Sequence, residues 1–453
     1  MKRHHVLPAA LGFVAASATA AAFVLGGTDQ QRLDVPAAIA ATTTTASTAA
    51  PTTTAPAGVP ALEVFGLDSV WSQTIDPASS CLMVLSGDRV LFERNPDLAV
   101  IPASTMKLVT ATAALADLGA DERLRTPVLA SSPPVDGVVD GDLFLVGGGD
   151  PVLGTVEWAA HFTRQPRLFT SIEALADRVV GAGVREVRGR IVGDDGRYDR
   201  ERYVPSWPQR YRDDNETGRL SALFVNDGFA VYENPDEQDI PWDDPPRDAA
   251  ALLTSLLRAR GVVVHGDAAA GAVTPDAVEV AAIESPTIGT LVASMLEDSD
   301  NGTAELLVKE LGVRGAGVGT TAAGIQVITD TLASLGLPTP GVTIQDGSGL
   351  SRDNQITCRL LAAILLQADP DGPIATGLPV AAQTGTLYKR FLATPVAGHL
   401  RAKTGSIRGV ASLAGYADAS SGTLTFVHVL NGIGGYNEAV LVQDALGAAL
   451  VDM

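Results

Sequence analysis

The sequence predicts an α/β (α+β) domain that is interrupted by a large, mostly β inserted lobe. Two short strand patterns and an apolar helix fall within residues 81–118, and helix patterns return after residue 286. The chain ends in a hairpin and a helix, whereas residues 132–285 consist mostly of short β-like runs and turns. Without that insert, about 70 residues from 62–131 and about 170 from 286–453 remain, which is the size of one ordinary domain.

Composition limits the classes of protein to consider. The 453-residue chain is 46% hydrophobic and 19% charged, which is typical of a folded protein with a large core. It has 32 Lys and Arg residues against 52 Asp and Glu residues, for a formal net charge of -20, and no basic run follows the first residues. Nucleic acid is therefore a poor candidate partner.

Residues 1–28 have the pattern of an export signal. Lys2, Arg3 and two histidines precede an uncharged run rich in Ala, Val, Leu and Phe. This run is also long enough to span a bilayer, so a cleaved signal peptide and a retained membrane anchor both stay open. Residues 29–61 are rich in Ala, Thr and Pro and predict an extended linker. We therefore expect an exported protein, in the cell wall or anchored to the outer face of the membrane.

The chain has two cysteines, Cys81 and Cys358, which lie far apart in the sequence. In an oxidising compartment the pair could form one disulfide, and the alternative is two unrelated buried thiols. Neither cysteine has a Cys or His partner at the spacing of metal ligands, so the sequence predicts no metal site. No cofactor is expected either.

The first part of the domain, 62–131, begins with two strands. The strand patterns at residues 81–85 and 89–93 flank a turn and lead into an apolar helix that opens around Ser104. Pro102 before this helix and Gly119 after its last apolar residue are the expected start and stop signals. Ser104 is therefore expected at the positive end of a helix dipole.

The inserted lobe, 132–285, contains four strand-like runs and two amphipathic helix patterns. The strand-like runs are 142–146, 190–195, 225–229 and 262–265, and the helices are 171–180 and 248–260. In the last part, 286–453, helix patterns flank residue 300 and cover 321–335, 438–450 and the residues after Thr357. A hairpin is expected from residues 409–416 and 424–430.

Ser104 and Lys107 are a candidate nucleophile and base. Their i to i+3 spacing places them on one face of the helix, so that the amine can reach the hydroxyl. A capped helix with a surface lysine is the alternative. The chain has only five lysines, at positions 2, 107, 309, 389 and 403, and otherwise takes its positive charge from arginine. A lysine kept inside an apolar helix indicates an amine that can lose its proton, which a guanidinium cannot do.

Two further motifs follow in the chain, Ser299-Asp300-Asn301 and Lys403-Thr404-Gly405-Ser406. Taken singly, the first could be an N-cap cluster and the second an ordinary strand start. Together with Ser104-x-x-Lys107, and in this order, they form the motif set of β-lactamases and penicillin-binding proteins.

Residues 62–453 resemble the D-alanyl-D-alanine carboxypeptidase/endopeptidase family, the low-molecular-mass class C penicillin-binding proteins. Longer matching strings are 145–151, Gly193-Asp194-Asp195, 299–305, Asp346-Gly347-Ser348-Gly349-Leu350-Ser351-Arg352 and 402–405. The resemblance implies a penicillin-binding-protein/β-lactamase-like transpeptidase domain, and the large insert is also typical of this family. One departure is Ser406, where the family usually has threonine. The hydroxyl is kept, so we expect altered rates rather than lost chemistry.

The resemblance implies a serine-type D-Ala-D-Ala carboxypeptidase that acts on peptidoglycan stem peptides and is inhibited by β-lactam antibiotics. DD-endopeptidase action fits equally well. In the implied mechanism Ser104 attacks the carbonyl, Lys107 takes the serine proton, and Ser299 passes a proton to the leaving amine. The implied substrate-binding residues are Asn301, Lys403, Thr404, Gly405 and Ser406.

Asp150 and Arg352 are the candidates for a side-chain specificity pocket, because some stem peptides carry a free amine and a carboxylate at their third residue. A turn cap and a surface arginine are the alternatives. Two rival functions stay open. A β-lactamase would normally use a carboxylate-activated water between the second and third motifs, and we identify no such carboxylate there. A non-catalytic, wall-associated penicillin-binding scaffold is the other, and the complete motif set argues against it.

Overall fold

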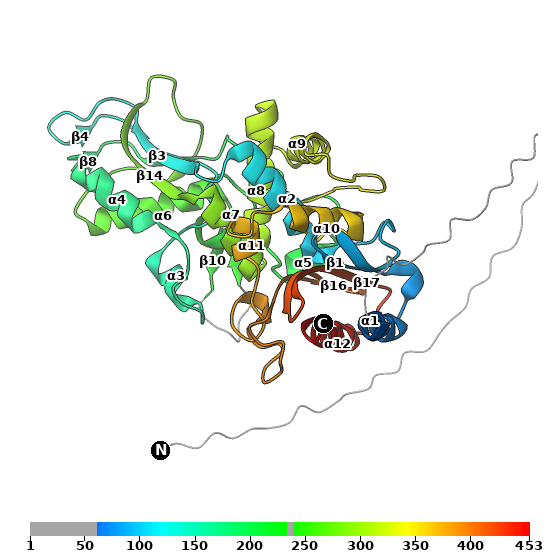
Figure 1. Cartoon of the computed structure of the whole chain (residues 1–453). Helices are drawn as coiled ribbons and strands as arrows, with labels where there is room; N and C mark the ends of the chain where they lie inside the picture. Colours follow the sequence, from blue (N-terminus) through cyan, green and yellow to red (C-terminus); the bar gives the residue numbers. More distant parts are fainter. Residues whose placement is uncertain (1–60, 233–238) are drawn as a thin grey trace, which may run out of the picture. The chain divides into compact units, whose positions relative to one another are not determined.

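The computed structural model describes residues 61–232 and 239–453 (Figure 1). The expected signal peptide or anchor, 1–28, and all but the last residue of the expected linker, 29–61, lie outside these residues. Among the helices of the described ranges, none combines the length and the hydropathy needed to cross a membrane.

The main domain is built on a five-stranded sheet with the order β15-β16-β17-β1-β2. Its strands are β1 (Cys81–Ser86), β2 (Arg89–Arg94), β15 (Leu400–Ile407), β16 (Val410–Ala419) and β17 (Gly422–Asn431). All four pairings are antiparallel, and β1 meets β17 with Cys81 opposite Val429. The first and last parts of the chain therefore share one sheet, as the two-part domain requires.

Helices cover both faces of this sheet (Figure 1). Successive strand residues point to opposite faces, and Cys81 to Leu85 of β1 are all buried. Met83 and Leu85 pack among the central helices, whereas Leu82 and Val84 pack towards α1 (Ala61–Ser72) and α12 (Tyr436–Val451). Burial on both faces explains why β1 reads as a continuous apolar run rather than an alternating one.

The central helices pack against the first of these faces. They are η2 (Ala103–Thr105), α2 (Met106–Ala113), η3 (Ala114–Leu118), α7 (Ile288–Asp298), α8 (Asn301–Ala316), α9 (Thr321–Ser334), α10 (Cys358–Gln367) and α11 (Pro373–Thr376). Helix α2 lies among them, and its side chains are buried on almost every side, including Lys107. The helix continues as the π-helical turn η3 and stops at Gly119, whose φ of 90° suits glycine. Cys358 forms a disulfide with Cys81, with the Cα atoms 6.1 Å apart, which links α10 to β1.

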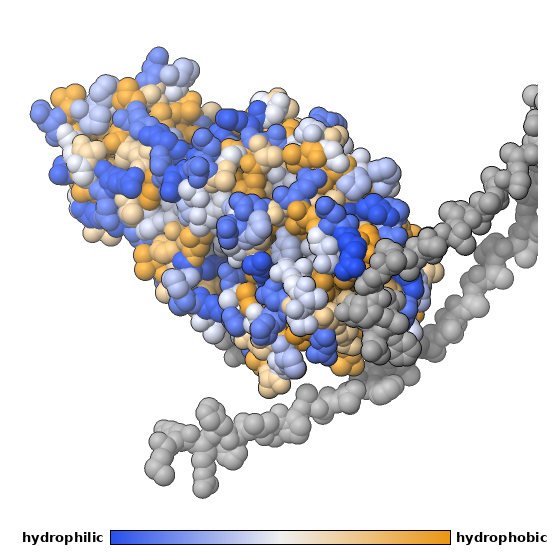
Figure 2. Space-filling model, viewed as in Figure 1, coloured by the Kyte–Doolittle hydropathy of each residue, from blue (hydrophilic) through white to orange (hydrophobic). Residues whose placement is uncertain are grey.

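The inserted lobe is centred on a second five-stranded sheet with the order β13-β9-β5-β3-β14. These strands are β3 (Arg123–Ala130), β5 (Leu143–Val146), β9 (Ile191–Asp194), β13 (Ala269–Ala270) and β14 (Val278–Thr287). Helices α4 (Ile172–Gly181) and α6 (Pro245–Ala259) contribute Leu175 and Leu253 to the core of the lobe. On the face shown in Figure 2, hydrophilic and hydrophobic residues are interspersed over the lobe and the main domain.

Smaller elements complete the chain. In the lobe they are β4 (Val138–Val139), β6 (Leu153–Gly154), α3 (Val156–His161), β7 (Thr170–Ser171), β8 (Glu186–Val187), α5 (Gln209–Asp213), η4 (Val225–Gly228), β10 (Phe229–Val231), β11 (Ile240–Pro241) and β12 (Val263–Val264). In the main domain they are η1 (Pro77–Ser79) and η5 (Gly385–Leu387).

The structure differs from the sequence-based expectation at two places in the lobe. Residues 225–229 form the turn η4 and only the first residue of a strand, because Asn226 and Asp227 adopt positive φ angles of 54° and 52°. Asn and Asp tolerate this left-handed conformation better than most residues. The sheet of the lobe also begins before residue 132, since β3 already pairs with β5 and β14.

Candidate active site

Ser104 lies in η2, and Lys107 lies one turn later in α2. The Lys107 side chain is fully buried and donates hydrogen bonds to three oxygens: Ser104 Oγ at 3.1 Å, Asn301 Oδ1 at 2.7 Å and the Ser348 carbonyl at 2.7 Å. None of these acceptors is a carboxylate. The i to i+3 spacing therefore does bring the amine to the hydroxyl, inside the protein rather than on its surface.

Burial controls the protonation of this amine. Desolvation lowers the pKa of Lys107 from its ordinary 10.5 to about 8, although the carboxylates of Asp300, Asp346, Glu305 and Glu216 oppose the shift. An amine with a pKa close to neutrality can accept a proton and release it again.

The Ser299-Asp300-Asn301 motif is the junction between two helices. Helix α7 ends before Ser299, which has a left-handed φ of 61°, and the Asp300 side chain caps α8 by accepting from the Thr303 N–H. The sharp turn aims both flanking side chains at the same pocket. Ser299 Oγ accepts a hydrogen bond from Lys403 Nζ at 2.8 Å, and Asn301 Oδ1 accepts from Lys107.

The third motif lies on the edge strand β15. Lys403 is fully buried, and its Nζ also donates to the Thr404 carbonyl at 2.8 Å. Burial and the neighbouring Lys107 lower the pKa of Lys403 well below its ordinary value. At Gly405 the strand passes so close to Ser104 that a Cβ atom would lie 2.8 Å from the Ser104 backbone nitrogen, so only glycine fits.

The three motifs line one pocket of about 290 Å³. Its motif residues are Ser104, Ser299, Asn301, Thr404, Gly405 and Ser406, and its other residues are Glu216, Leu350, Thr386 and Tyr436. Leu350 belongs to a string already singled out in the sequence. Glu216, Thr386 and Tyr436 were missed, because no spacing or motif in the sequence links them to the three motifs.

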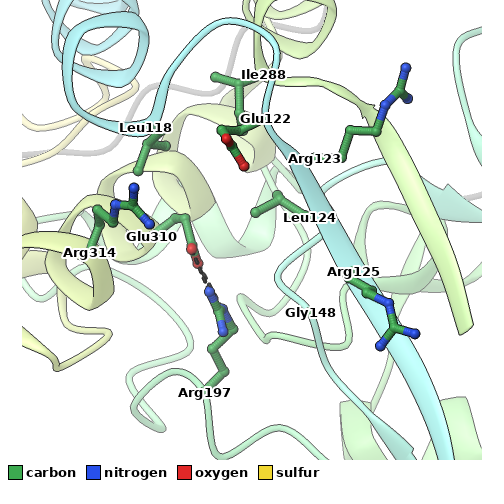
Figure 3. Close-up of a pocket in the computed structure, with 10 residues that line it drawn as sticks. All are labelled: Leu118, Glu122, Arg123, Leu124, Arg125, Gly148, Arg197, Ile288, Glu310 and Arg314. Carbon is green, nitrogen blue, oxygen red and sulfur yellow. Dashed lines mark hydrogen bonds and ion pairs between the residues drawn. The ribbon is translucent and has the colours of Figure 1, made fainter.

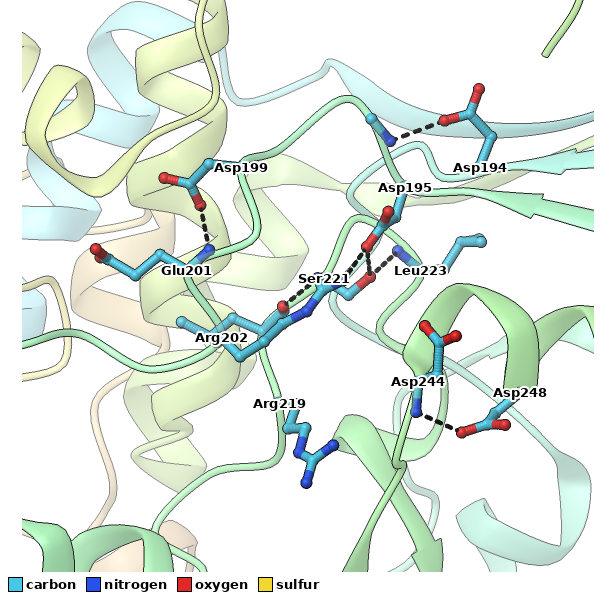
Figure 4. A network of polar contacts seen from close by, with 12 residues as sticks. Asp194, Asp195, Asp199, Glu201, Arg202, Arg219, Ser221, Leu223, Asp244 and Asp248 are labelled. Carbon is cyan, nitrogen blue, oxygen red and sulfur yellow. Dashed lines mark hydrogen bonds and ion pairs between the residues drawn. The ribbon is translucent and has the colours of Figure 1, made fainter. Parts of the chain in front are cut away.

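Glu216 reaches the pocket on a long segment of the inserted lobe. Polar contacts hold this segment: Asp195 accepts from Arg202 at 2.6 Å and from Ser221 Oγ at 3.0 Å (Figure 4). The Glu216 carbonyl then accepts from Asn301 Nδ2 at 2.8 Å. Partial burial, together with Asp214, raises the pKa of the Glu216 carboxyl. The lobe thus supplies one wall of the pocket.

The string from Asp346 to Arg352 positions the third acceptor of Lys107. The buried Glu305 carboxylate accepts from the backbone N–H groups of Gly347 and Ser348, at 3.1 and 2.8 Å. Burial and the nearby Asp346 raise the pKa of Glu305 to about 7. These bonds fix the turn whose Ser348 carbonyl faces Lys107.

Neither Asp150 nor Arg352 is among the residues that line the pocket, and the pairing of the two in a specificity pocket stays a prediction. Asp150 is 1% exposed and accepts from the Val152 N–H at 3.0 Å, which makes it the turn cap of the alternative interpretation. Its burial raises the pKa to about 6. Arg352 is exposed and donates to the Arg408 carbonyl. Sequence order alone could not show that the Asp150 turn faces into the lobe.

The lobe also contacts the main domain at a second, separate pocket of about 230 Å³ (Figure 3). There Arg197 donates to Glu310 of α8 at 2.8 Å, and the buried Tyr198 hydroxyl donates to the same carboxylate at 3.0 Å. Burial raises the pKa of Tyr198 well above its ordinary value. These groups are paired with one another and hold the lobe in place. Over residues 61–232 and 239–453, no cluster of three or more His, Cys, Asp or Glu side chains could hold a metal ion.

Comparisons with known proteins agree with this geometry. The family model described as the D-Ala-D-Ala carboxypeptidase 3 (S13) family matches residues 73–239 and 222–450. A D-alanyl-D-alanine carboxypeptidase from Actinomadura sp. (strain R39) is 31% identical over 439 residues, which cover 80% of this chain and 79% of the relative. A carboxypeptidase from Mycobacterium tuberculosis is 30% identical, with coverage of 76% and 74%.

Solved structures share the fold at low sequence identity. Penicillin-binding protein 4 from Haemophilus influenzae superposes with a TM-score of 0.69 at 19% identity, covering 84% of this chain and 97% of that one. A predatory peptidoglycan endopeptidase from Bdellovibrio bacteriovorus superposes with a TM-score of 0.53 at 16% identity, covering 82% and 92%. The main domain and the inserted lobe together therefore follow a fold already seen.

Proposed function

The chain belongs to the D-Ala-D-Ala carboxypeptidase 3 (S13) family of peptidases, and from this premise we propose how its residues work. Ser104 is the nucleophile of a serine-type D-Ala-D-Ala carboxypeptidase that acts on peptidoglycan stem peptides through an acyl-enzyme. The single observation that carries the proposal is a pair of serine–lysine contacts in one pocket, Lys107 with Ser104 and Lys403 with Ser299.

Lys107 is the base of the acylation step. Its neutral amine takes the proton from Ser104 Oγ while that oxygen attacks the carbonyl carbon of the D-Ala-D-Ala bond. The 3.1 Å contact and the pKa of about 8 both support this role. Asn301 and Ser348 hold the amine by accepting its hydrogen bonds, and neither adds a negative charge that would keep it protonated.

Lys403 and Ser299 serve the leaving group. The Ser299 hydroxyl gives its proton to the departing amine and takes a proton from the Lys403 ammonium, which donates a hydrogen bond to Ser299 Oγ. The substrate's terminal carboxylate binds beside Lys403, with the Thr404 and Ser406 hydroxyls as donors. This carboxylate favours the charged form of Lys403, and a charged Lys403 in turn favours the neutral form of Lys107. Substrate binding thereby shifts Lys107 towards the neutral amine that can accept the Ser104 proton.

The developing oxyanion is stabilised by the backbone N–H groups of Ser104 and Ser406. The approach of β15 to the Ser104 nitrogen, seen at Gly405, supports this arrangement. One such donor is worth about 3 kcal/mol in the barrier. Water then hydrolyses the ester and frees Ser104. A β-lactam amide enters by the same first step, but its leaving amine stays tethered, so the acyl-enzyme lasts longer.

β-Lactamase action is the second candidate, because the Glu216 carboxylate lines the pocket. A carboxylate beside the ester could activate the hydrolytic water and make deacylation of penicillin fast. The two functions share the nucleophile and differ in the lifetime of the penicilloyl ester.

Intact-protein mass spectrometry after incubation with benzylpenicillin tests both candidates. We expect the full chain to gain the mass of one opened penicillin and Ser104→Ala to gain none. Hydrolysed drug without a lasting adduct would favour the lactamase. Intact drug without an adduct would overturn the enzyme mechanism and favour a binding scaffold.

We also propose that the protein is exported and acts on the outer side of the membrane, where peptidoglycan lies. The pattern of residues 1–28 supports export, either with cleavage or with retention as an anchor. The mass of the mature chain decides between the two. A chain that lacks about 28 residues indicates a cleaved signal, and a full-length chain in the membrane fraction indicates an anchor.

A further inference from the structure

The pocket of about 230 Å³ between the inserted lobe and the main domain has no role in the proposed reaction (Figure 3). We call it the interface pocket. Of the described residues that line it, none also lines the pocket around Ser104. Its volume is below that of sites for drug-sized ligands, so it suits a molecule of a few heavy atoms.

Two charged side chains of the interface pocket, Glu122 and Arg314, have no partner in the described part of the chain. Arg314 lies four residues after Glu310 on α8, which is the spacing at which an ion pair is expected. Glu310 instead accepts from Arg197 Nε at 2.8 Å and from the Tyr198 hydroxyl at 3.0 Å. The donors of Arg314 therefore stay free for a ligand.

The backbone of Glu122 is held on both sides. Its N–H donates to the Gly119 carbonyl at 3.3 Å, and its carbonyl accepts from the Ile288 N–H at 2.8 Å. Figure 3 shows the Glu122 carboxylate pointing into the interface pocket, which Arg314 enters from the side of α8. The pocket thus presents one free anion and one free cation to the same space.

Two further arginines line the interface pocket but are engaged elsewhere. Arg125 donates to Glu279 at 2.6 Å, and Arg123 donates to the Ser285 carbonyl at 2.7 Å. Both guanidinium groups turn away from Glu310 in Figure 3. The charges left for a ligand are therefore one of each sign, which fits a zwitterion better than a simple anion.

Apolar side chains complete the interface pocket. Leu118 and Leu124 are each 7% exposed, and Ile288 is fully buried. They offer contact to an uncharged part of a ligand. An α-amino acid with a small apolar side chain combines all three features, because it has a carboxylate, an ammonium and a few carbon atoms.

We propose that the interface pocket binds such a free amino acid, and that its ligand is D-alanine. The carboxylate accepts hydrogen bonds from Arg314, and the ammonium donates to Glu122. The choice of D-alanine rests on the proposed function, which releases it as a product, whereas the chemical class rests on the pocket alone. Helix α8 connects the two sites, because Asn301 at its start contacts Lys107 and Arg314 lies in its last turn.

Ligand-observed NMR measures the affinity of the full chain for D-alanine after benzylpenicillin has filled the pocket around Ser104. The matched ligands are D-lactate, which lacks the ammonium, and D-alaninamide, which lacks the carboxylate. We expect saturable binding of D-alanine and at least about tenfold weaker binding of both analogues, because each has lost one charge-assisted contact. The absence of saturable D-alanine binding overturns the proposal. Equal binding of D-lactate also overturns it, because the pocket would then be a simple anion site.

Glu122→Gln and Arg314→Gln test whether D-alanine lies in the interface pocket. Both side chains are exposed, so the variants should unfold at the wild-type temperature. Each should weaken D-alanine binding at least about tenfold. The controls Asp121→Asn and Arg188→Gln remove exposed charges of the same signs outside this pocket and should bind as the wild type does. Unchanged binding in both Glu122→Gln and Arg314→Gln overturns the proposal.

The acylation step keeps this test separate from the proposed function. A chain that benzylpenicillin does not acylate contradicts the role of Ser104. D-alanine binding is then measured on the unacylated chain, and the loss of binding in Glu122→Gln and Arg314→Gln supports or overturns the interface pocket as before.

Discussion

Two lysines of this protein are buried to the same degree and have opposite surroundings. Lys107 is 0% exposed and Lys309 is 1% exposed. Lys309 Nζ lies 2.6 Å from the Asp199 carboxylate, whereas Lys107 Nζ meets only a hydroxyl, an amide oxygen and a backbone carbonyl. A buried ammonium is costly unless a carboxylate pairs with it. The partner therefore decides whether a buried lysine serves as a structural ion or as a base.

The same contrast holds between the regions around them. Where the inserted lobe meets α8, the cations Arg197 and Lys309 have direct carboxylate partners in Glu310 and Asp199. In the pocket around Ser104, no carboxylate contacts the amines of Lys107 and Lys403 directly, and both amines donate to neutral oxygens. The first region holds the lobe to the main domain, and the second keeps two amines ready to exchange protons.

The same substitution at the two lysines gives the largest expected difference. Lys107→Met removes the base, so we expect the rate of acylation by benzylpenicillin to fall by about 10³-fold or more. Stopped assays followed by mass spectrometry measure that rate. A variant that still acylates at more than a tenth of the wild-type rate would show that another group deprotonates Ser104.

Lys309→Met should affect stability instead. It leaves Asp199, whose side chain is 29% exposed, without its cation, and we expect the free energy of unfolding to fall by about 2 kcal/mol. The acylation rate of the folded fraction should stay at the wild-type value. Denaturant titration combined with the acylation assay checks both parts. Loss of acylation at unchanged stability would mean that the carboxylate partner does not set the role of a buried lysine here.

The sequence indicated the motifs that meet in the pocket better than the residues around them. The contact of Lys107 with Ser104 follows from their short fixed spacing, Ser299 and Lys403 belong to short motifs, and the two strand patterns near residue 81 match β1 and β2 closely. Such local patterns depend on helix and strand periodicity, which the sequence carries directly.

The missed residues depend on contacts between distant segments. Glu216 reaches the pocket on a long lobe segment that contacts of Asp195 with Arg202 and Ser221 fix within the lobe. Its carbonyl meets the main domain by accepting from Asn301 Nδ2. The burial of Asp150 is likewise not visible in the sequence, because a turn residue can face the solvent or the interior, and here it is 1% exposed. The start of the lobe was placed too late because β3 finds its partners in β5 and β14, beyond the composition break.

A carboxylate placed beside Lys107 should make it resemble Lys309. Asn301→Asp puts that group where the amide oxygen now lies, 2.7 Å from Nζ, and raises the pKa of Lys107 above about 8. For the wild type we expect the acylation rate to rise with pH around a midpoint near 8, because the neutral amine is the reactive form. In Asn301→Asp the midpoint should move to higher pH, and for each pH unit that it moves the rate at pH 7.5 should fall about tenfold.

Asn301→Ala is the control, since it removes the amide without adding charge. A pH profile with the wild-type midpoint in Asn301→Asp would contradict the role of neutral partners.

The smallest expected effect is at Glu216, whose charge opposes the lowered pKa of Lys107 from the edge of the pocket. Glu216→Gln removes that charge and leaves the backbone carbonyl free to bind Asn301 Nδ2 as before. The pKa of Lys107 should then fall, which moves the midpoint of the acylation profile to lower pH and raises the rate at pH 7 by a few-fold at most. Only the ionised Glu216 carboxylate affects the pKa of Lys107, and the pKa of Glu216 is itself raised. The acylation profiles of the wild type and Glu216→Gln should therefore converge at acidic pH. Asp121→Asn, an exposed carboxylate outside the pocket, should leave the profile unchanged. If Glu216→Gln instead lengthens the lifetime of the penicilloyl ester, Glu216 activates the hydrolytic water. The surroundings of Lys107 would then contain a catalytic carboxylate, unlike the structural carboxylate beside Lys309.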